Sequence, residues 1–312
     1  MSNRRKFIQQ ISSIGAISLV NPTKLLATTD TEHLCIMHTN DVHSHIEPFP
    51  LDHKKHPGMG GVARRAELIN KIRSEVKHTL LLDAGDMFQG TPYFNYYGGE
   101  LEFKLMNAMK YDAATIGNHD FDNGVAGLAK QAKNAEFKLL SANYSFEDTP
   151  MNGLTKPYHI FNKRKFKIGV FGLGIELKGL VDPKMYGNTQ YNDPIKIAIK
   201  ISDYLRNIKG CNLIICLSHL GLKYESKQVS DIVLAEQCPE IDIILGGHTH
   251  SFVDKPIEIR SVIGKSTYIS QVGWAGLMLG RIDVKLELKT NRLVIKSQSE
   301  RISQKTTFSS LS

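Results

Sequence analysis

The stretch Leu34-Cys35-Ile36-Met37-His38-Thr39-Asn40-Asp41-Val42-His43 is an apolar run of strand type, followed at once by residues that can bind a metal ion. Four further segments end in residues of the same kind, and three of them also directly follow an apolar run. Ligands placed just past strand ends can converge along one edge of a sheet. The pattern therefore predicts a two-metal hydrolase site. The further segments are Asp83-Ala84-Gly85-Asp86, Gly117-Asn118-His119-Asp120, Leu217-Ser218-His219 and Gly246-Gly247-His248-Thr249-His250.

Strand and helix signals alternate along most of the chain. Leu34–Met37 and Thr79–Leu82 are strand-like, and between them 61–76 has apolar residues at helical spacing. Near-continuous apolar strands that alternate with helices are typical of an α/β sheet buried on both faces. Further helices are expected at 100–109, 125–135 and 195–208, strands at 113–116, 137–140, 213–217 and 241–245, and a hairpin at 158–171 with its turn at 162–165.

The chain becomes strand-rich after His250, with strands expected at 267–272, 277–288 and 293–297. We expect this end to form a second sheet packed on the first. The predicted fold is α/β, a four-layer α-β-β-α sandwich of two mixed sheets flanked by helices. No linker divides residues 30–300, which are expected to form one catalytic domain between an export signal (1–29) and a tail (301–312).

The N-terminus has the features of an export signal. Arg4 and Arg5 precede hydrophobic residues, and the weakly apolar stretch 11–20 is shorter than the ~20 residues that a membrane helix needs. This arrangement resembles the bacterial twin-arginine signal, which predicts an exported protein, periplasmic or associated with the cell envelope, with no integral span in the mature chain. A frayed basic terminus is the alternative, and the signal is either cleaved or kept as an anchor.

Charge and cysteine content exclude some other functions. The net charge is +8, and four basic residues without an acidic one lie before residue 28, so the rest of the chain carries about +4. No basic stripe is interleaved with aromatic residues, which argues against nucleic-acid binding. No C-x-x-C pair exists, so a zinc–thiolate site is not expected. Cys35 and Cys216 lie in apolar runs and are interpreted as buried structural thiols.

Imidazole and oxygen ligands without thiolates suit divalent zinc, manganese, iron or cobalt. Two such ions ~3.5–4 Å apart can bind both sides of a phosphoryl group and generate hydroxide near neutral pH. Asp86 is the candidate bridging ligand, because Gly85 allows close approach of the backbone. Asp41 and His43 would point to the same side in an extended local conformation.

The last two segments add further ligands and a candidate acid. His248 and His250 have the same spacing as the first pair, so they can give one ligand to each ion, and Asn118 supplies a neutral oxygen. His119 follows directly and is predicted to stabilise charge in the transition state and to protonate the leaving oxygen. Asp122 is placed to hydrogen-bond that imidazole and raise its pKa.

The segment 111–122 (Tyr-Asp-Ala-Ala-Thr-Ile-Gly-Asn-His-Asp-Phe-Asp) resembles the signature of the metallophosphoesterase superfamily, in particular its 5′-nucleotidase branch. The segment 83–91 looks like the nucleotidase version too. The motif order D-x-H, G-D, G-N-H-(E/D), H and G-H-x-H is similar over residues 33–285. Asp120 stands where the family usually has Glu, at a position that is not a ligand.

The resemblance implies which residues hold metal. It implies one ion held by Asp41, His43, Asp86 and His250, and a second held by Asp86, Asn118, His219 and His248. It also implies that His119 and Asp122 form the catalytic pair. The expected activity is hydrolysis of phosphate esters, with 5′-nucleotidase-type release of phosphate from nucleotides.

Family nucleotidases continue into a second domain that holds the nucleoside, whereas this chain stops at Ser312. We therefore expect that half to be missing or to be a separately encoded partner, and nucleoside selectivity to be poor. Two alternatives stay open. One is a hydrolase of a cyclic nucleotide, a nucleotide sugar or a thiosulfonate. The other is a metal-binding subunit that completes a separate nucleoside-binding domain, although such a subunit would not need His119 and Asp122.

Other polar and aromatic residues near these motifs receive structural interpretations. His38, His45 and Asp83 are expected to be structural or to support the ligands. The aromatic residues at 93–97 could line a substrate edge or a partner interface, or simply pack. Isolated histidines are interpreted as surface or core residues; these are His33, His53, His56, His78 and His159.

Overall fold

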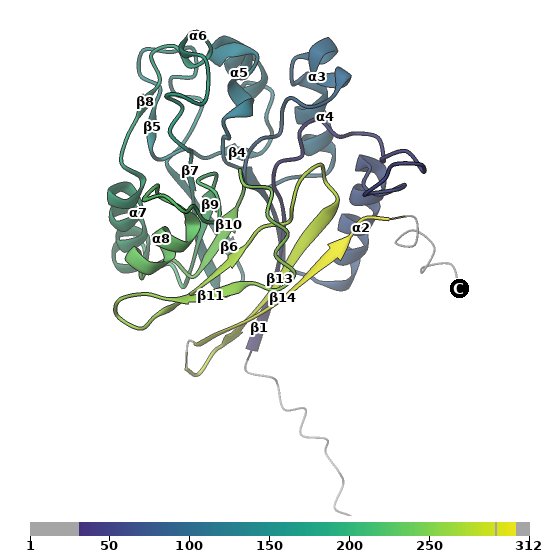
Figure 1. The fold of residues 1–312 in the computed structure, drawn as a ribbon. Helices are drawn as coiled ribbons and strands as arrows, with labels where there is room; N and C mark the ends of the chain where they lie inside the picture. The colour runs from purple at the N-terminus through teal and green to yellow at the C-terminus, as the bar shows by residue number, and fades with distance from the viewer. Residues whose placement is uncertain (1–30, 291, 304–312) are drawn as a thin grey trace, which may run out of the picture.

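The computed structural model describes residues 31–303 except residue 291. Two six-stranded sheets pack face to face, and helices cover their outer faces (Figure 1). The predicted four-layer α-β-β-α sandwich of two mixed sheets is therefore confirmed. Within the described residues, no helix is both long enough and apolar enough to span a membrane.

The first sheet has the strand order β14-β13-β1-β2-β3-β4. Its strands β1 to β4 are parallel, and β13 and β14 continue the sheet antiparallel on the other side of β1. The bounds are β1 (Thr31–Thr39), β2 (Thr79–Asp83), β3 (Ala113–Ala114), β4 (Lys138–Leu139), β13 (Met278–Glu287) and β14 (Arg292–Arg301).

The second sheet has the order β11-β12-β10-β9-β7-β6, with a parallel centre and an antiparallel strand at each edge. The short strands β5 (Tyr144–Ser145) and β8 (Gln190–Tyr191) form a separate pair. The bounds in the second sheet are β6 (Tyr158–Lys163), β7 (Phe166–Leu173), β9 (Leu213–Ser218), β10 (Ile243–Gly246), β11 (Ile257–Arg260) and β12 (Ser266–Ser270).

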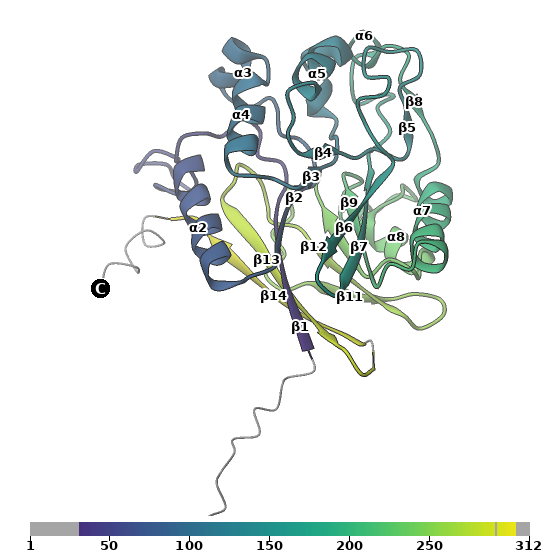
Figure 2. The same ribbon diagram turned by 180° about the vertical axis from the view of Figure 1, so that it is seen from behind.

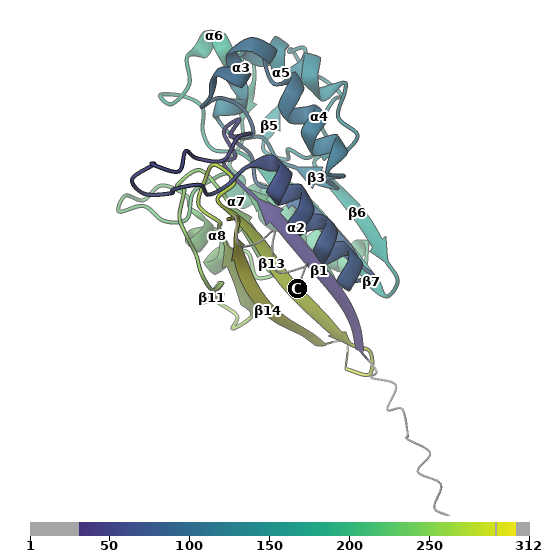
Figure 3. The same cartoon turned by 90° about the vertical axis from the view of Figure 1, so that its right-hand side faces the viewer.

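Helices from both halves of the chain form the outer layers. Figure 3 shows α2 running beside β1 on the outer face of the first sheet, and Figure 2 shows α7 and α8 against the second sheet. The bounds are α2 (Val62–Glu75), α3 (Pro92–Tyr97), α4 (Glu100–Ala108), α5 (Gly124–Ala132), α6 (Pro183–Tyr186), α7 (Pro194–Asp203) and α8 (Asp231–Gln237).

Alternation along β1 explains why its sequence is apolar on both faces. Cys35 and Met37 join the cluster formed with α2, α4 and α5, whereas Leu34 and Ile36 join the core between the two sheets. A strand buried on both faces must be apolar at every position. Full burial of each aliphatic side chain contributes roughly 1.5–3 kcal/mol to folding, so these positions tolerate few polar residues.

The strand-rich C-terminal end does not form the second sheet alone, contrary to expectation. β13 and β14 extend the first sheet, because β1 offers β13 an open edge from Thr31–Glu287 to His38–Gly280. A hydrogen bond between Nε2 of His33 and Oδ1 of Asp283, at 2.7 Å, joins the two strands. The second sheet is built mainly from the middle of the chain, with β11 and β12 added at one edge.

Several local features differ from the sequence expectation. The helix expected at 195–208 is an α-helix to Asp203 and then a π-helical turn over Tyr204–Ile208. The turn of the β6–β7 hairpin contains only residues 164 and 165, since β6 continues to Lys163. The short elements α3, α6, α8, β5, β8 and β11 were not predicted. Each has seven residues or fewer, which is too short to show a clear hydrophobic period.

All four cysteines are buried and free, which confirms the interpretation of Cys35 and Cys216 as structural thiols. Burial raises the pKa of Cys35 to about 12, so its thiol stays protonated and unreactive at neutral pH.

Candidate metal centre

Five loops meet where the parallel strands β1, β2, β3, β9 and β10 end. The two sheets face each other, so the carboxyl ends of the central strands in both sheets lie at the same edge of the sandwich. Figure 1 shows α3, α5 and α6 beyond this edge. The residues predicted as ligands are brought together here from both sheets.

Asp41, His43 and His250 form one candidate ligand group, whose ligand atoms all lie within 4.8 Å of one another. Nε2 of His43 is 3.0 Å from Nε2 of His250, and the latter is 3.3 Å from Oδ1 of Asp41. Asp41 is fully buried and His43 nearly so. Three lone-pair donors that face one another in this way suit a shared cation.

Asp86, His219 and His248 form the second group, again with all ligand atoms within 4.8 Å. Oδ1 of Asn118 lies 2.8 Å from Nδ1 of His248, so the amide oxygen adjoins this group. Oδ2 of Asp86 is 3.1 Å from Nε2 of His219 and 3.8 Å from Nε2 of His43. Asp86 therefore stands between the two groups, as a bridging ligand must.

Two histidines are fixed with a ring nitrogen directed into the site. Nδ1 of His219 donates to the carbonyl of Ala84 at 2.7 Å, and Nδ1 of His43 donates to the carbonyl of Phe88 at 3.2 Å. A carbonyl only accepts, so each Nδ1 carries the hydrogen and each Nε2 keeps its lone pair. Nε2 of His219 is fully buried and, despite its short distance to Asp86, lacks the geometry of a hydrogen bond. This unpartnered nitrogen of His219 fits a bound metal ion.

The electrostatics of the site favour a cation. Burial lowers the pKa of His248 to about 4 and also lowers that of His43, which leaves the neutral imidazoles that metal binding requires. Burial opposes a charge on His219, but Asp86 and Asp41 outweigh it and raise the pKa of His219 to about 10. The carboxylates of Asp86 and Asp41 thus favour a positive charge beside His219. A bound divalent ion can provide that charge in place of a proton on the imidazole.

The ligand loops do not have the extended conformation expected from the sequence. The φ angles are 49° at Asp41, 50° at His43 and 56° at Asp86, in the left-handed region, and His248 and His250 lie there too. Such conformations are strained for residues with a Cβ. Hydrogen bonds between the loops hold them, with Asp41 N donating to Gly85 O at 2.9 Å and His43 N to Asp86 O at 3.0 Å.

Two glycines allow the second and third loops to approach each other. A Cβ on Gly117 would lie 2.1 Å from Oδ1 of Asp86, and a Cβ on Gly85 would lie 2.7 Å from the backbone nitrogen of Gly117. Both distances are far below van der Waals contact. Gly85 also has a φ of 91°, which favours glycine. The expected close approach at Gly85 is therefore present.

His119 lies beside the ligand groups on the more open side. Its Nδ1 is 2.8 Å from Oδ2 of Asp122, and its side chain is 40% exposed. This hydrogen bond is the main reason why the pKa of His119 is raised, with Asp86 adding to it. An ionised carboxylate only accepts, so Nδ1 carries the hydrogen and Nε2 faces away from Asp122.

Asp120 is a structural residue of this site that the sequence did not identify. Its buried carboxylate accepts hydrogen bonds from the backbone nitrogens of Asp86 (3.1 Å), Met87 (2.9 Å), Phe88 (3.1 Å) and Gly117 (2.8 Å). Burial, together with the nearby charge of Asp86, raises the pKa of Asp120 to about 8. This residue therefore ties the second and third ligand loops together.

Asn40 and Trp274 also support the ligands without having been predicted. Nδ2 of Asn40 donates to Oδ2 of Asp41 at 2.7 Å and to the carbonyl of Gly273 at 2.7 Å. The Trp274 ring stacks on His250 with 5.8 Å between centroids and 8° between planes. No motif spacing reveals the contact of Asn40 with Gly273 or that of Trp274 with His250, because each joins positions more than 20 residues apart.

The residues given structural interpretations lie outside both ligand groups of the described chain. His38 is buried and hydrogen-bonds Ser270 at 3.0 Å, and His45 stacks on Phe49. Asp83 is buried and accepts from Thr39 and from the nitrogen of Gly85. Of the aromatic residues at 93–97, Phe94 packs on Phe88, while the side chains of residues 96 and 97 are exposed.

Residues 35–252 match the family described as calcineurin-like phosphoesterase. A snake venom 5′-nucleotidase from Crotalus adamanteus is 35% identical over 290 residues, covering 86% of this chain and 47% of the venom protein. The chain thus spans about half the length of the curated relatives that it matches.

Two solved structures have the same arrangement over most of this chain. A 5′-nucleotidase precursor from Thermus thermophilus is 32% identical with a TM-score of 0.79, covering 88% of this chain and 55% of that one. The NAD nucleotidase of Haemophilus influenzae is 28% identical with a TM-score of 0.76, covering 87% of this chain and 56% of that one.

Proposed function

The chain belongs to the calcineurin-like phosphoesterases, and from that premise we propose that it hydrolyses phosphate esters, with nucleoside 5′-phosphates as its main substrates. The observation that carries this proposal is the pair of neighbouring ligand groups. Asp86 of the second group lies close both to His219 of its own group and to His43 of the first. Similarity to 5′-nucleotidases of a snake venom and of Thermus thermophilus supports the substrate class.

We propose that the two groups hold two divalent ions of zinc, manganese, iron or cobalt. When bound, such ions polarise a phosphoryl group and activate water for attack on phosphorus. The donor set of carboxylate, imidazole and one amide fits these ions, since it contains no thiolate. The first ion would be held by Asp41, His43, Asp86 and His250, and the second by Asp86, Asn118, His219 and His248.

The chain's own acid is His119. Its Nδ1–H is held by Asp122, so Nε2 is the atom that can carry a proton to the leaving oxygen of the ester. The Asp122 carboxylate favours the protonated ring, as the raised pKa of His119 shows. Partial exposure of both side chains leaves room for a substrate to reach this nitrogen.

The test is a substrate panel on the purified chain, loaded in turn with each of the four metals. The panel contains a nucleoside 5′-monophosphate, an aryl phosphate, a bis-aryl phosphodiester, a cyclic nucleotide, a nucleotide sugar and a thiosulfonate. We expect metal-dependent release of phosphate, fastest from the nucleoside monophosphate. Absence of turnover with every metal and substrate would overturn the enzyme proposal.

A second candidate activity is hydrolysis of dinucleotides such as NAD, which the likeness to the NAD nucleotidase of Haemophilus influenzae favours. It uses the same ligands and the same acid, with a nucleotide as leaving group. Adding NAD to the panel separates the two, because release of two mononucleotides precedes release of phosphate only in the second case. A pure metal-binding subunit would cleave none of these substrates.

We also propose that the chain is exported and that a separate polypeptide contacts the nucleoside. The twin-arginine motif, which lies outside the described residues, and the likeness to a venom enzyme support export. Replacing Arg4 and Arg5 by lysine should then retain the protein inside the cell, as fractionation would show.

Co-purification with a partner that sharpens discrimination between nucleosides would support the proposal that a separate polypeptide contacts the nucleoside. Unchanged selectivity with every co-purifying protein would contradict it.

A further inference from the structure

His250 is the exposed member of the first ligand group. Its side chain is 39% exposed, whereas Asp41 and His43 are buried. Nε2 of His250 faces the group, at 3.3 Å from Oδ1 of Asp41, so this nitrogen is the candidate ligand atom. The ring of an exposed side chain changes rotamer readily, and a histidine that is held in its binding orientation binds a metal ion more tightly. The orientation of the His250 ring therefore affects how well the first group can bind an ion.

Hydrogen bonds within the described residues do not orient this ring. Nδ1 of His43 and Nδ1 of His219 each donate to a backbone carbonyl. No residue of the described chain forms a hydrogen bond with Nδ1 of His250, whose Nε2 faces the ligand group. Metal-binding histidines generally gain their orientation from a hydrogen bond on the second ring nitrogen. A different contact must therefore orient His250.

The indole of Trp274 provides such a contact. Its centroid lies 5.8 Å from that of the His250 ring, and the two planes are 8° apart. Aromatic pairs favour offset stacking with centroids roughly 4.5–7 Å apart. A bound cation draws electron density from an imidazole, and the face of an indole favours a positively charged partner. The stack thus holds the plane of the His250 ring and favours its metal-bound form.

Trp274 is itself held by the loop that carries Asp41. Nδ2 of Asn40 donates to the carbonyl of Gly273 at 2.7 Å, and the nitrogen of Ala275 donates to the carbonyl of Asp41 at 2.7 Å. Ala275 has a φ of 54°, which is strained for a residue with a Cβ. Hydrogen bonds on both sides of Trp274 therefore keep the backbone in a conformation that the segment would not favour alone.

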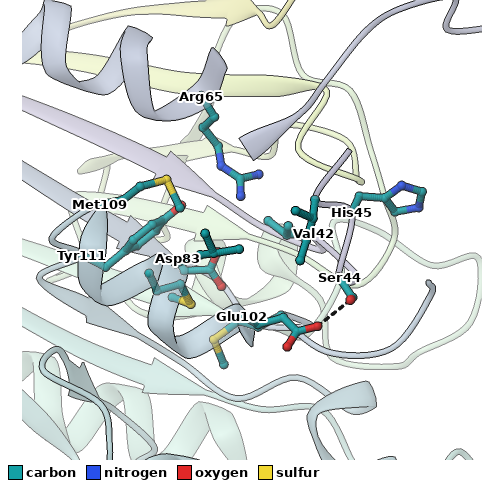
Figure 4. A pocket seen from close by; sticks show the side chains of 12 residues that line it. Val42, Ser44, His45, Arg65, Asp83, Glu102, Met109 and Tyr111 are labelled. Carbon is teal, nitrogen blue, oxygen red and sulfur yellow. Dashed lines mark hydrogen bonds between the residues drawn. The ribbon is translucent and has the colours of Figure 1, made fainter. Parts of the chain in front are cut away.

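Two rings from the loop after His43 also pack on the indole. His45 meets it at 90° with 5.4 Å between centroids, and Phe49 meets it at 73° with 5.9 Å. Figure 4 shows the ring of His45 directed outward, away from Glu102. Trp274 is thereby in contact with both loops that supply the first ligand group.

We propose that Trp274 is a positioning residue for the first ion. It orients His250 by stacking, in place of the hydrogen bond that orients His43 and His219. This inference rests on the proposed function, in which His250 is a ligand. The ring contacts of Trp274 within the described residues include no candidate ligand of the second ion. Loss of the indole should therefore weaken binding of the first ion selectively.

The first test is calorimetric titration of Zn²⁺ into the intact, metal-free protein. His250→Ala identifies which binding step belongs to the first ion. Trp274→Leu removes the ring but keeps an apolar side chain. We expect its affinity for the first ion to fall roughly tenfold, with the affinity for the second ion unchanged.

Trp274→Phe separates stacking from simple packing, because it keeps a ring face at this position. We expect this variant to recover most of the affinity that Trp274→Leu loses. Phe161→Leu is the matched control. Phe161 forms a ring pair with His159 on β6, an edge strand of the second sheet, and its loss should leave both affinities unchanged.

The second test uses fluorescence, since Trp274 is the only tryptophan in the sequence. Zn²⁺ has a filled d shell, so it should alter the emission only through the stacked imidazole. We expect the emission of the wild type to change as the first ion binds and to stay constant as the second ion binds. Emission that does not respond while calorimetry records both ions would contradict the stack.

The outcomes distinguish this inference from the proposed function. Equal affinity of wild type and Trp274→Leu for the first ion would overturn the positioning role. An equal loss for both ions would also overturn it, because Trp274 would then support the loops in general. A Trp274→Phe variant as weak as Trp274→Leu would exclude stacking as the cause. A wild type that binds no metal would instead contradict the proposed function, and the positioning role with it.

Discussion

His119 is the proposed general acid, and its ring is oriented by a hydrogen bond to Asp122. The Asp122 carboxylate accepts this hydrogen bond from the Nδ1–H of the ring at 2.8 Å, and His119 belongs to neither ligand group of the described residues. His119→Ala should therefore leave two ions per chain but lower kcat by roughly 10²–10⁴-fold, as expected for loss of a general acid. Metal analysis and steady-state kinetics on the same sample measure both quantities. A variant that keeps wild-type kcat would show that another group protonates the leaving oxygen.

The convergence of the candidate ligands could be predicted from the sequence, because each follows a strand end and the carboxyl ends of parallel strands share an edge. That these residues bind metal stays a prediction. Asp120 could not be predicted as a structural residue, since its four donors come from two separate loops. The conformation of Asp41 and His43 was expected to be extended and is left-handed, because hydrogen bonds to the next loop decide it. The residue types indicate the chemistry of the site, whereas contacts between distant segments determine the backbone conformation of its loops.

At the scale of elements, the loops after β2 and β3 function as one packed unit. Gly117 lies against Asp86, with 2.1 Å from an added Cβ to Oδ1 of that ligand. Gly117→Ala should push the loops apart and abolish binding of both ions, because Asp86 is the proposed bridging ligand. Calorimetric titration with metal checks this. Gly153→Ala, where a Cβ would meet nothing within 4 Å, is the control and should bind normally.

The contact between β9 and α8 gives the protein a pH-dependent element. Asp231 at the start of α8 accepts a hydrogen bond from Ser218, and burial raises the pKa of Asp231 from 3.8 to about 8. Its folded pKa is above its unfolded pKa, so its stabilising contribution is complete below the unfolded value and is lost as pH rises through about 8.

Asp231→Asn removes this ionisation while keeping the shape of the side chain. The stability of the variant relative to wild type should therefore rise between about pH 5 and about pH 8. Urea unfolding of both proteins across that range measures the difference. Parallel stability curves would show that Asp231 does not retain its proton in the folded state.

Element assignment from sequence succeeded where an element is long and buried. The apolar runs of β1, β2, β9 and β10 were recognised, because strands buried on both faces admit few polar residues. Short elements such as α3 and α8 carry too little periodicity. The pairing of β13 with β1 was missed because local sequence does not encode which edge a late strand joins.

At the level of the whole molecule, the candidate metal centre is built from loops of both sheets. The loops after β1, β2 and β3 belong to the first sheet, and those after β9 and β10 belong to the second. Ions bound between them should stabilise the entire sandwich. The four-layer architecture was predictable from the alternation of strand and helix signals along the chain. Which sheet each strand joins was not predictable, because the C-terminal strands β13 and β14 return to the first sheet.

Chelation should therefore lower thermal stability. An ion present at about 100 times its Kd contributes roughly 2.7 kcal/mol to the folded state, which corresponds to a Tm shift of roughly 5–10 °C for a domain of this size. Differential scanning calorimetry with and without a chelator measures this shift. Asp86→Asn should be insensitive to the chelator, and a wild-type Tm that does not respond would contradict metal binding at this edge.

Asp86 is proposed to bridge two metal ions whose other ligands come from both sheets. Anomalous diffraction from a crystal of the metal-loaded protein, recorded at the absorption edge of the metal, locates these ions. We expect two peaks ~3.5–4 Å apart, one beside Asp41, His43 and His250, the other beside Asn118, His219 and His248, with Asp86 contacting both. A single peak, or two peaks that Asp86 does not bridge, would contradict it.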